Sequence, residues 1–364
     1  MIKSKMISKY IIVMCAVFLC TSLVLSQDTN RVDVKGFPVA YYTPETGFAF
    51  GLFGITSFNW KKDSLNARRS NVTMGMAYTT KNQFLLYLPY SLFLKNDAYR
   101  ISGELGYYDY VYPFYGVGNF EDESQTRKEN FSIRFPRVRS SVYKRMNTFL
   151  FLGFRYAYDH YFDLKVEDSS IIESQKLTGL EAGTNSGLGP AFLIDSRDNV
   201  FYPRKGWLVD VSSAFDLGKI VSDYAFTRLN VDVANYSSIG KRSVLASNFY
   251  YQQNTGNVPF YQLSLLGGGK RLRGIVEGEI RSNYAWQTQV EYRQEFLKNW
   301  GFTIFTATGL AAPRWDSAQF KNLKAGYGVG LRYKLNKKDH VNIRLDLGYS
   351  NNQLLPYFTI GEAF

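Results

Sequence analysis

The sequence predicts an all-β protein: an antiparallel transmembrane β-barrel of about 16 strands. Three observations lead to this fold class. Apolar and polar residues alternate in segments of about ten residues, and turn residues separate these segments. Aromatic residues make up 17% of the chain, with 28 Tyr and 28 Phe, which favours strands over helices. The chain also begins with a segment typical of exported proteins.

The N-terminal segment has the order of a secretory signal peptide. Three lysines come first, an uncharged apolar run follows, and polar residues begin after it. We therefore expect a signal peptide over residues 1–26 cleaved near Ser26, a short periplasmic leader over 27–36 and the barrel over 37–364. The alternative is an uncleaved anchor helix. The apolar run is short for a membrane span and ends in polar residues, which disfavours that alternative.

The candidate strands show alternation with a period of two. In the segment 324–335, Tyr327, Val329 and Leu331 share one face, while glycines and Arg332 share the other. The predicted strands are 37–43, 47–59, 70–79, 82–94, 98–110, 129–143, 147–162, 186–196, 206–216, 222–236, 243–253, 283–297, 300–310, 324–335, 340–350 and 355–364. A soluble sandwich could show the same alternation with its apolar face inward. The export segment and the aromatic content favour a polar lumen and a lipid-facing exterior.

The predicted connections alternate between two kinds. One set is mostly short and basic, such as Lys-Asn-Asp at 95–97 and Gly-Lys-Arg at 240–242. The other set contains the long members 111–128, 163–185 and 254–282. Barrels with both termini in the periplasm have short turns on that side and long loops outside. We therefore place the basic turns in the periplasm and the long connections at the cell surface.

The stretch Gly-Gly-Gly-Lys-Arg at 267–271 looks at first like a phosphate loop. A Walker loop needs glycine and a hydroxyl residue where this chain has Ser264 and Arg271. Neither a Gly-x-Ser-x-Gly elbow nor a nucleophile–base set is evident, and both cysteines lie in the predicted signal peptide. The sequence therefore predicts no enzyme activity and no cofactor; a lipid-hydrolase barrel is the last-ranked alternative.

Metal and nucleic-acid binding are also disfavoured. The two histidines, His160 and His340, do not have zinc-site spacing. The acidic segment 195–199 reads as a turn rather than a calcium loop, because a proline and a glycine follow it closely. The net charge of +12 is spread over short dispersed pieces, and export separates the chain from nucleic acid.

Four segments follow one another in a fixed order: DSRDNVFYPRKG from Asp195, RLRGI from Arg271, GYGVGLRY from Gly326 and a terminal FTIGEAF. Together they resemble the BamA/TamA superfamily of outer-membrane assembly barrels, the bacterial surface antigens, without the periplasmic POTRA domains of that family. The matching residues are Asp195, Arg197, Asp198, Pro203 and Gly206 in a turn motif; Leu272, Arg273, Gly274 and Ile275 in the sixth outer loop; and Phe358, Ile360, Gly361 and Phe364 in a C-terminal signal.

The resemblance implies that the sixth outer loop folds into the barrel and that Arg273 pairs with carboxylates in the lumen. Glu291 is the first candidate partner, because strand parity places it inward. Asp346 is the second. The family has an inward aspartate on the following strand, where this chain has Ala307. At that position this chain therefore offers Arg273 no carboxylate.

The resemblance also implies an integral protein of the Gram-negative outer membrane that aids assembly or insertion of other outer-membrane proteins, without chemical catalysis. Its mechanism would use a weak joint between the first and last strands, which can pair with a new strand. The expected partners are membrane lipids and other outer-membrane or periplasmic proteins. The alternative is a secretion pore, or a structural subunit that anchors a partner at the outer membrane.

Overall fold

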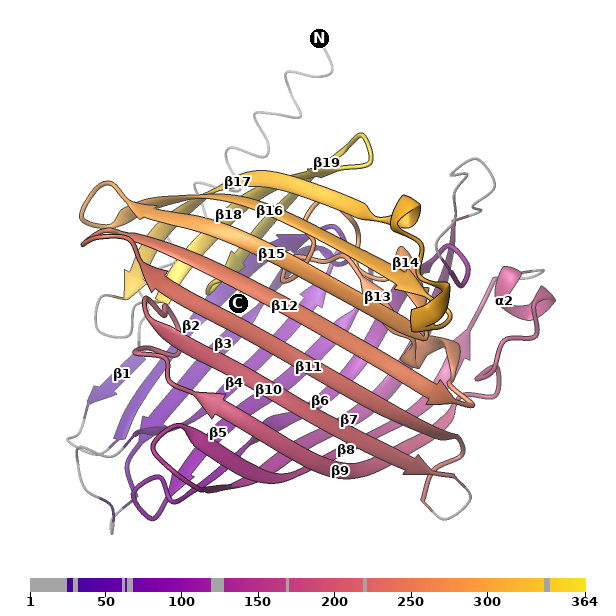
Figure 1. Ribbon diagram of the computed structural model, residues 1–364, viewed down its shortest axis with the longest axis horizontal. Coiled ribbons are helices and arrows are strands. Elements are labelled where there is room, and N and C mark those ends of the chain that lie inside the picture. The colour runs from indigo at the N-terminus through magenta and orange to yellow at the C-terminus, as the bar shows by residue number, and fades with distance from the viewer. Residues whose placement is uncertain are drawn as a thin grey trace.

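The computed structural model describes residues 25–28, 32–60, 63, 68–118, 128–167, 170–218, 221–336 and 341–364. Residues 1–24 of the predicted signal peptide lie outside this part, so the signal peptide remains a prediction. The described chain forms a closed antiparallel barrel (Figure 1). The predicted barrel of about 16 strands is confirmed. Among the described residues, no helix is both long and apolar enough to cross a membrane.

The barrel strands follow one another around the wall in chain order, and the last strand meets the first. They are β2 (Val32–Thr43), β3 (Gly47–Phe58), β4 (Ser70–Thr79), β5 (Phe84–Leu94), β6 (Tyr99–Phe114), β7 (Glu129–Arg145), β8 (Leu150–Lys165), β9 (Gly183–Asp195), β10 (Gly206–Leu217), β11 (Ala225–Ser238), β12 (Ser243–Gly256), β15 (Tyr284–Glu295), β16 (Trp300–Ala312), β17 (Lys324–Asn336), β18 (Val341–Ser350) and β19 (Gln353–Ile360). Closure excludes the sandwich alternative, because a sandwich leaves its edge strands apart.

Several smaller elements do not belong to the wall strands named above. A short strand β1 (Leu25–Asp28) pairs with the start of β2. A short helix α2 (Ile171–Ser174) lies in the connection between β8 and β9. The connection between β12 and β15 contains the 3₁₀ helix η3 (Phe260–Gln262) and a two-stranded hairpin of β13 (Ser264–Leu266) and β14 (Ile280–Ser282).

Most strand boundaries lie within three residues of the prediction, and three differ by more. The first barrel strand begins at Val32, not at Phe37, because its ladder with β3 continues to the pair Val32–Phe58. The strand predicted over 98–110 continues to Phe114, where it pairs with Glu129 of β7. The last strand ends at Ile360, so the prediction of a strand to Phe364 is wrong. Gly361 adopts φ +90°, which ends the strand.

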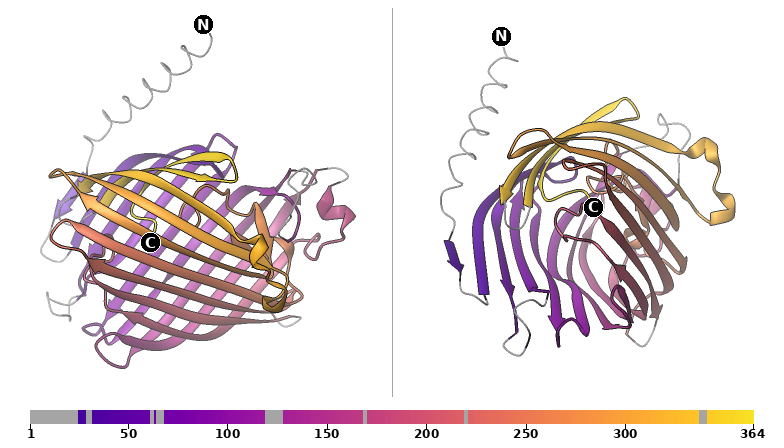
Figure 2. Two further views of the ribbon diagram at one scale, coloured as in Figure 1. Left: turned by 45° about the horizontal axis from the view of Figure 1, so that its top comes forward. Right: turned by 60° about the vertical axis from the view of Figure 1, so that its left-hand side comes forward.

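The two ends of the barrel differ in their connections. The described parts of the short basic turns lie at one end, which we call the inner end. The described parts of the long connections 115–128, 166–182 and 257–283 lie at the other end, which we call the outer end (Figure 2). This separation agrees with the predicted two kinds of connection.

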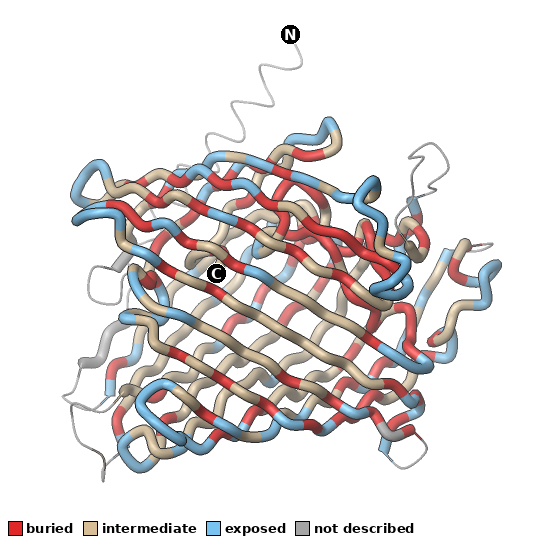
Figure 3. Tube along the Cα trace, viewed as in Figure 1, coloured by how far each residue is buried: buried red, intermediate tan, exposed pale blue. Residues whose placement is uncertain are grey.

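Burial alternates along the strands (Figure 3). On β15, the inward side chains Gln287, Gln289 and Glu291 are 3%, 2% and 0% exposed. On β17, the outward side chains Tyr327 and Val329 are 60% and 54% exposed. Polar side chains therefore line the lumen and apolar side chains cover the exterior, as a membrane-spanning barrel requires.

An aromatic cluster fills the lumen near the outer end. Phe114 on β6, Phe131 and Phe135 on β7 and Tyr161 on β8 pack there with Phe260 of η3. The rings of Phe131 and Phe260 lie 4.9 Å apart between centroids in an edge-on arrangement. This cluster fixes the start of the 257–283 connection against the wall.

Neighbouring residues on β11 allow a direct test of which face meets lipid. Val231 points outward, whereas Asn230 points inward and accepts a hydrogen bond from Tyr250 Oη at 3.4 Å. We expect Val231→Lys to lower the free energy of unfolding by about 2–4 kcal/mol, because the charge would enter the middle of the lipid layer. Urea titration in phosphatidylcholine vesicles measures this change. Asn230→Lys is the matched control and should have a much smaller effect; equal effects would contradict the assigned faces.

Candidate functional site

The connection 257–283 is the sixth of the outer end, and its tip reaches the lumen-facing wall. Leu272 and Ile275 are 0% and 1% exposed. They form one apolar cluster with side chains of the loop's own hairpin and of the wall: Leu266, Ile280, Ala285, Ala307 and Ala311. Ala307, which replaces the family's aspartate, therefore lies in an apolar contact with the loop rather than in a charged one.

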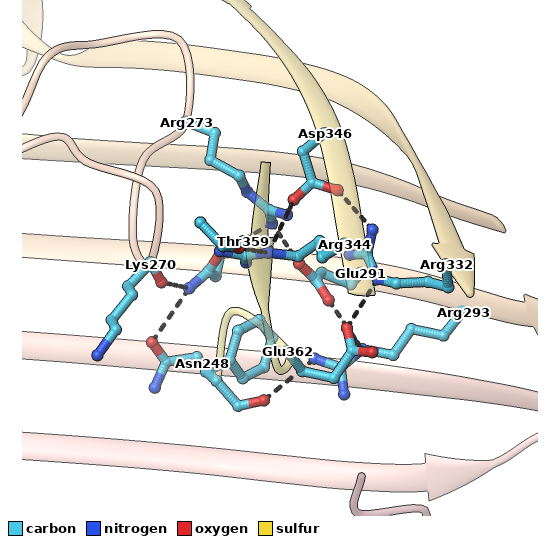
Figure 4. A network of polar contacts seen from close by, with 12 residues as sticks. Asn248, Lys270, Arg273, Glu291, Arg293, Arg332, Arg344, Asp346, Thr359 and Glu362 are labelled. Carbon is cyan, nitrogen blue, oxygen red and sulfur yellow. Dashed lines mark hydrogen bonds and ion pairs between the residues drawn. The ribbon is translucent and has the colours of Figure 1, made fainter. Parts of the chain in front are cut away.

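Arg273 lies between the two carboxylates predicted as its partners (Figure 4). Its Nη1 donates to Asp346 Oδ2 on β18 at 2.6 Å, and its Nη2 donates to Glu291 Oε1 on β15. Nη2 also donates to Gln289 Oε1 at 3.2 Å. The guanidinium carbon lies 3.5 Å from the ring centroid of Phe305. The three charged side chains are 0% exposed, so each one depends on the others for compensation of its charge.

Further charged side chains extend this pair into a network. Glu291 Oε2 accepts from Arg293 Nε at 2.8 Å. Asp346 Oδ1 accepts from Arg332 Nη1 at 2.5 Å, and Arg344 lies 3.6 Å from the same carboxylate. With Arg273 and Glu362, the network contains four arginines and three carboxylates, so it carries one surplus positive charge.

Sequence reasoning did not identify all members of this network. Arg293, Arg332 and Arg344 were recognisable as inward by parity, but parity does not give the height at which a side chain lies in the lumen. Glu362 was missed because the last residues were assigned to the final strand. Gly361 was the available signal, since glycine often marks a point where a strand ends or bends.

The C-terminal residues turn into the lumen after Gly361. Glu362 accepts from Arg332 Nε at 2.9 Å and from Asn342 Nδ2 at 2.8 Å. Burial by itself raises the pKa of the Glu362 carboxyl, but the charges of Arg332 and Arg293 outweigh it and hold this pKa below its ordinary value. Four residues, 361–364, thus form an inward C-terminal tail held by a charged carboxylate.

Phe364 fixes the end of this tail. Its ring stacks on Tyr236 of β11, 6.1 Å away between centroids, and its carbonyl oxygen accepts from Arg293 Nη2 at 3.2 Å. Phe358 and Ile360 remain in β19, where they pair with Leu345 and Ile343 of β18. The residues predicted as a C-terminal signal are therefore divided between the wall and the lumen.

The joint between the last and the first strand is short. β19 pairs with β18 along its whole length, from Gln353 to Ile360. It pairs with β2 only at Phe358, opposite Tyr42. β1 covers the same edge of β2 at residues 33–36. Within the described strands, residues 37–41 of β2 have no ladder partner on this edge. We call this joint the seam.

The sixth loop contacts both sides of the seam. On the β19 side, the backbone N–H of Gly274 donates to Tyr357 Oη at 3.1 Å. On the β2 side, the backbone N–H of Glu277 donates at 2.9 Å to Glu45 Oε1 in the turn between β2 and β3. Glu45 is 5% exposed, and Lys81 Nζ donates to its carbonyl oxygen at 3.0 Å. The loop thus connects the last strand to the first hairpin.

Comparison with known protein families identifies the family of this barrel. The model described as the Omp85 superfamily domain matches residues 55–364. The chain belongs to the Omp85 superfamily. Solved structures of the same fold agree with this assignment, and no curated protein showed a significant sequence match.

Three structures resemble this Omp85 barrel over 92% of its chain. BamA from Haemophilus ducreyi lacking POTRA domains 1–3 has a TM-score of 0.60 and 14% identity, with 71% of its own chain covered. CdiB from Acinetobacter baumannii has a TM-score of 0.59 and 13% identity, and CdiB from Escherichia coli 0.57 and 12%. This chain spans 60% and 63% of those two CdiB chains. At these identities the likeness establishes the fold alone.

The predicted turn motif of this Omp85 barrel lies at the inner end. Asp195 is within 2.9 Å of Arg197, 3.1 Å of Arg100 and 3.5 Å of Arg68. Asp198 Oδ1 accepts from two backbone N–H groups, those of Arg204 at 2.9 Å and Lys205 at 3.2 Å. Both aspartates therefore hold the turn together. Among the described residues, no group of three or more His, Cys, Asp or Glu side chains could hold a metal ion.

Gly206, the last residue of this motif, is required by the close packing of the turn. It adopts φ +107°, and a Cβ atom there would lie 2.2 Å from the carbonyl oxygen of Ser196. Pro203 lies in the same turn, before β10 begins. The motif therefore stabilises the inner-end turn. Among the described residues, no hydrogen bond or ion pair joins it to the Arg273 network.

Proposed function

We propose that this Omp85 outer-membrane barrel assists the insertion of other outer-membrane barrel proteins of a Gram-negative cell, without chemical catalysis. The observation that supports it best is the seam, in which β19 and β2 pair at a single position. A strand edge with unpaired N–H and C=O groups can accept a further strand by backbone hydrogen bonding. A short joint reduces the free energy needed to free that edge.

The sixth loop holds the two sides of the seam together. Its tip is fixed by Arg273 in the lumen and by one hydrogen bond to each side of the seam. The hydrogen bond to the Tyr357 hydroxyl contributes about 1 kcal/mol and the one to the Glu45 carboxylate about 1.5–3 kcal/mol, so the two seam contacts can break without loss of the fold. The buried Arg273 pair is stronger and would keep the loop in the lumen while the seam opens.

The test uses the full chain in phosphatidylcholine vesicles and a urea-unfolded eight-stranded outer-membrane barrel as client. Folding of the client is followed by its mobility shift on unboiled gels. We expect the client to fold several-fold faster in vesicles that contain this protein than in protein-free vesicles. An equal rate in both, with the barrel shown to be folded, would overturn the proposal.

The second candidate is a translocation pore or an anchoring subunit, which the likeness to the CdiB structures and the polar lumen wall favour. A pore requires the sixth loop and the C-terminal tail to leave the lumen. Conductance across a planar bilayer distinguishes the candidates: steady single-channel currents from the intact chain, without client stimulation, would favour the pore.

A further inference from the structure

The connection between β16 and β17 presents large aromatic side chains to solvent. It contains the 3₁₀ helices η4 (Trp315–Ser317) and η5 (Phe320–Asn322). Trp315 is 69% exposed and Phe320 is 84% exposed. The connection extends beyond the outline of the barrel wall instead of covering the lumen (Figure 2, right). Exposed aromatics of this size need an apolar or interfacial environment.

The lipid-facing side of β17 leads directly into this connection. Its outward side chains Leu331, Val329 and Tyr327 are 39%, 54% and 60% exposed. Leu323, at the same parity just before the strand, is 39% exposed. The apolar exterior thus continues as far as Leu323, and the exposed Phe320 of η5 lies three residues before it in the chain.

A crevice lies between this connection and the outer ends of two neighbouring strands, β12 and β15. It encloses about 280 Å³. The lining side chains that matter here are Gln253, Thr255, Tyr284, Arg314, Trp315 and Asp316. By strand parity Gln253 and Thr255 of β12 and Tyr284 of β15 face outward, so the crevice opens on the lipid-facing side and not into the lumen.

The charge of the connection is positive. The connection contains Arg314 and Lys321 against a single acidic residue, Asp316, and Lys324 follows at the start of β17. Arg314 Nε pairs with Asp316 at 3.1 Å, and the two side chains are 76% and 47% exposed. An ion pair this exposed is weak, so Arg314 can turn toward a stronger anion at little cost. Guanidinium groups bind phosphate in bidentate fashion.

We propose that this crevice binds the phosphorylated headgroup of an outer-leaflet lipid, with Trp315 and Phe320 inserted at the membrane interface. Arg314 contacts the phosphate, while Gln253, Thr255 and the Tyr284 hydroxyl supply hydrogen bonds to headgroup oxygens. Trp and Tyr favour the interface because one end of each ring system is apolar and the other is polar. The volume suits a headgroup, and the acyl chains lie along the outward faces of β12 and β15, where Phe249 and Val290 are each 39% exposed. The proposal rests on the outer end facing the cell exterior.

Membrane insertion of the connection is tested with a single cysteine. In the full chain with Cys15 and Cys20 replaced by serine, Phe320→Cys carries a bimane label, and Ser174→Cys on α2 is the matched exposed control. Both are placed in nanodiscs that contain phosphatidylcholine brominated near the headgroup. We expect strong quenching at position 320 and little at 174. Equal, weak quenching at both positions would overturn the insertion and favour a protein partner for these aromatics.

Headgroup binding is tested by the affinity of the reconstituted chain for lipid A, a phosphorylated glycolipid. We expect Arg314→Gln with Trp315→Ala to weaken it about tenfold, while Arg204→Gln at the inner end leaves it unchanged. Unchanged affinity in the double variant would overturn the site. Soluble glucosamine phosphate should not compete at equal concentration; full competition would show a free-sugar site instead. The readout is lipid binding, so its outcome is independent of client folding.

Discussion

Arg273→Met is expected to lower the free energy of unfolding of the barrel by about 3 kcal/mol and to release the sixth loop. The variant removes the hydrogen bonds to Glu291 and Asp346 and leaves both carboxylates buried. Glu291 keeps Arg293, and Asp346 keeps Arg332 and Arg344, which places the effect at the lower end for a broken buried pair. Urea titration measures the stability, and limited proteolysis with proteinase K measures loop release.

Arg271→Met is the control for this prediction. Arg271 lies in the same loop and pairs with Asp232 at 2.7 Å, but the two side chains are 23% and 28% exposed. Screening by solvent should limit its effect to about 1 kcal/mol or less. Combining Arg273→Met with Glu291→Gln should recover part of the loss, because a neutral amide tolerates burial better than a carboxylate. A protected loop and unchanged stability in Arg273→Met would contradict this account.

Locking the seam is expected to abolish the proposed insertion activity without unfolding the barrel. The change is Tyr42→Cys with Phe358→Cys, at the single position where β2 and β19 pair. A disulfide there would hold the two strand edges together, so a client strand could not pair with either. Client folding in vesicles should fall to the rate without protein when the pair is oxidised, and recover when it is reduced.

A disulfide between two strands that stay paired is the matched control. Ile343→Cys with Ile360→Cys joins β18 to β19, which are neighbours along the whole of β19. We expect this variant to stimulate client folding as well as the unmodified chain, in both redox states. If the oxidised seam variant kept full activity, seam opening could not be the mechanism, although the Omp85 fold would be unaffected.

Much of the wall was predictable from the sequence because lipid imposes a local rule. A residue on a barrel strand faces either lipid or lumen, and the period of two decides which. The segment 324–335 therefore revealed β17 and its two faces from its letters alone. The same rule placed Glu291 inward and made it a reasonable partner for Arg273. The four motifs from Asp195 to the C-terminus indicated the family, since their order and spacing are a property of the sequence.

The contacts across the lumen were harder to predict from the sequence. Parity gives the face of a residue but not its height, so Arg332 and Arg344 could be called inward without being placed beside Asp346. The outer connection 313–323 was passed over because its aromatics have no periodicity. The membrane-contact role proposed for these aromatics depends on the position of the connection, which lies beyond the wall and next to the crevice.

The sequence by itself determined the barrel, its approximate strand number, the two kinds of connection and the loop that carries Arg273. The resemblance implied a weak joint between the first and last strands, and the tertiary structure decided where that joint pairs and what holds it. A single pair joins Phe358 to Tyr42, Gly361 sends the tail inward, and the sixth loop reaches Tyr357 on one side and Glu45 on the other. The reason is physical: alternation is a local property of one strand, whereas closure joins segments at opposite ends of the chain.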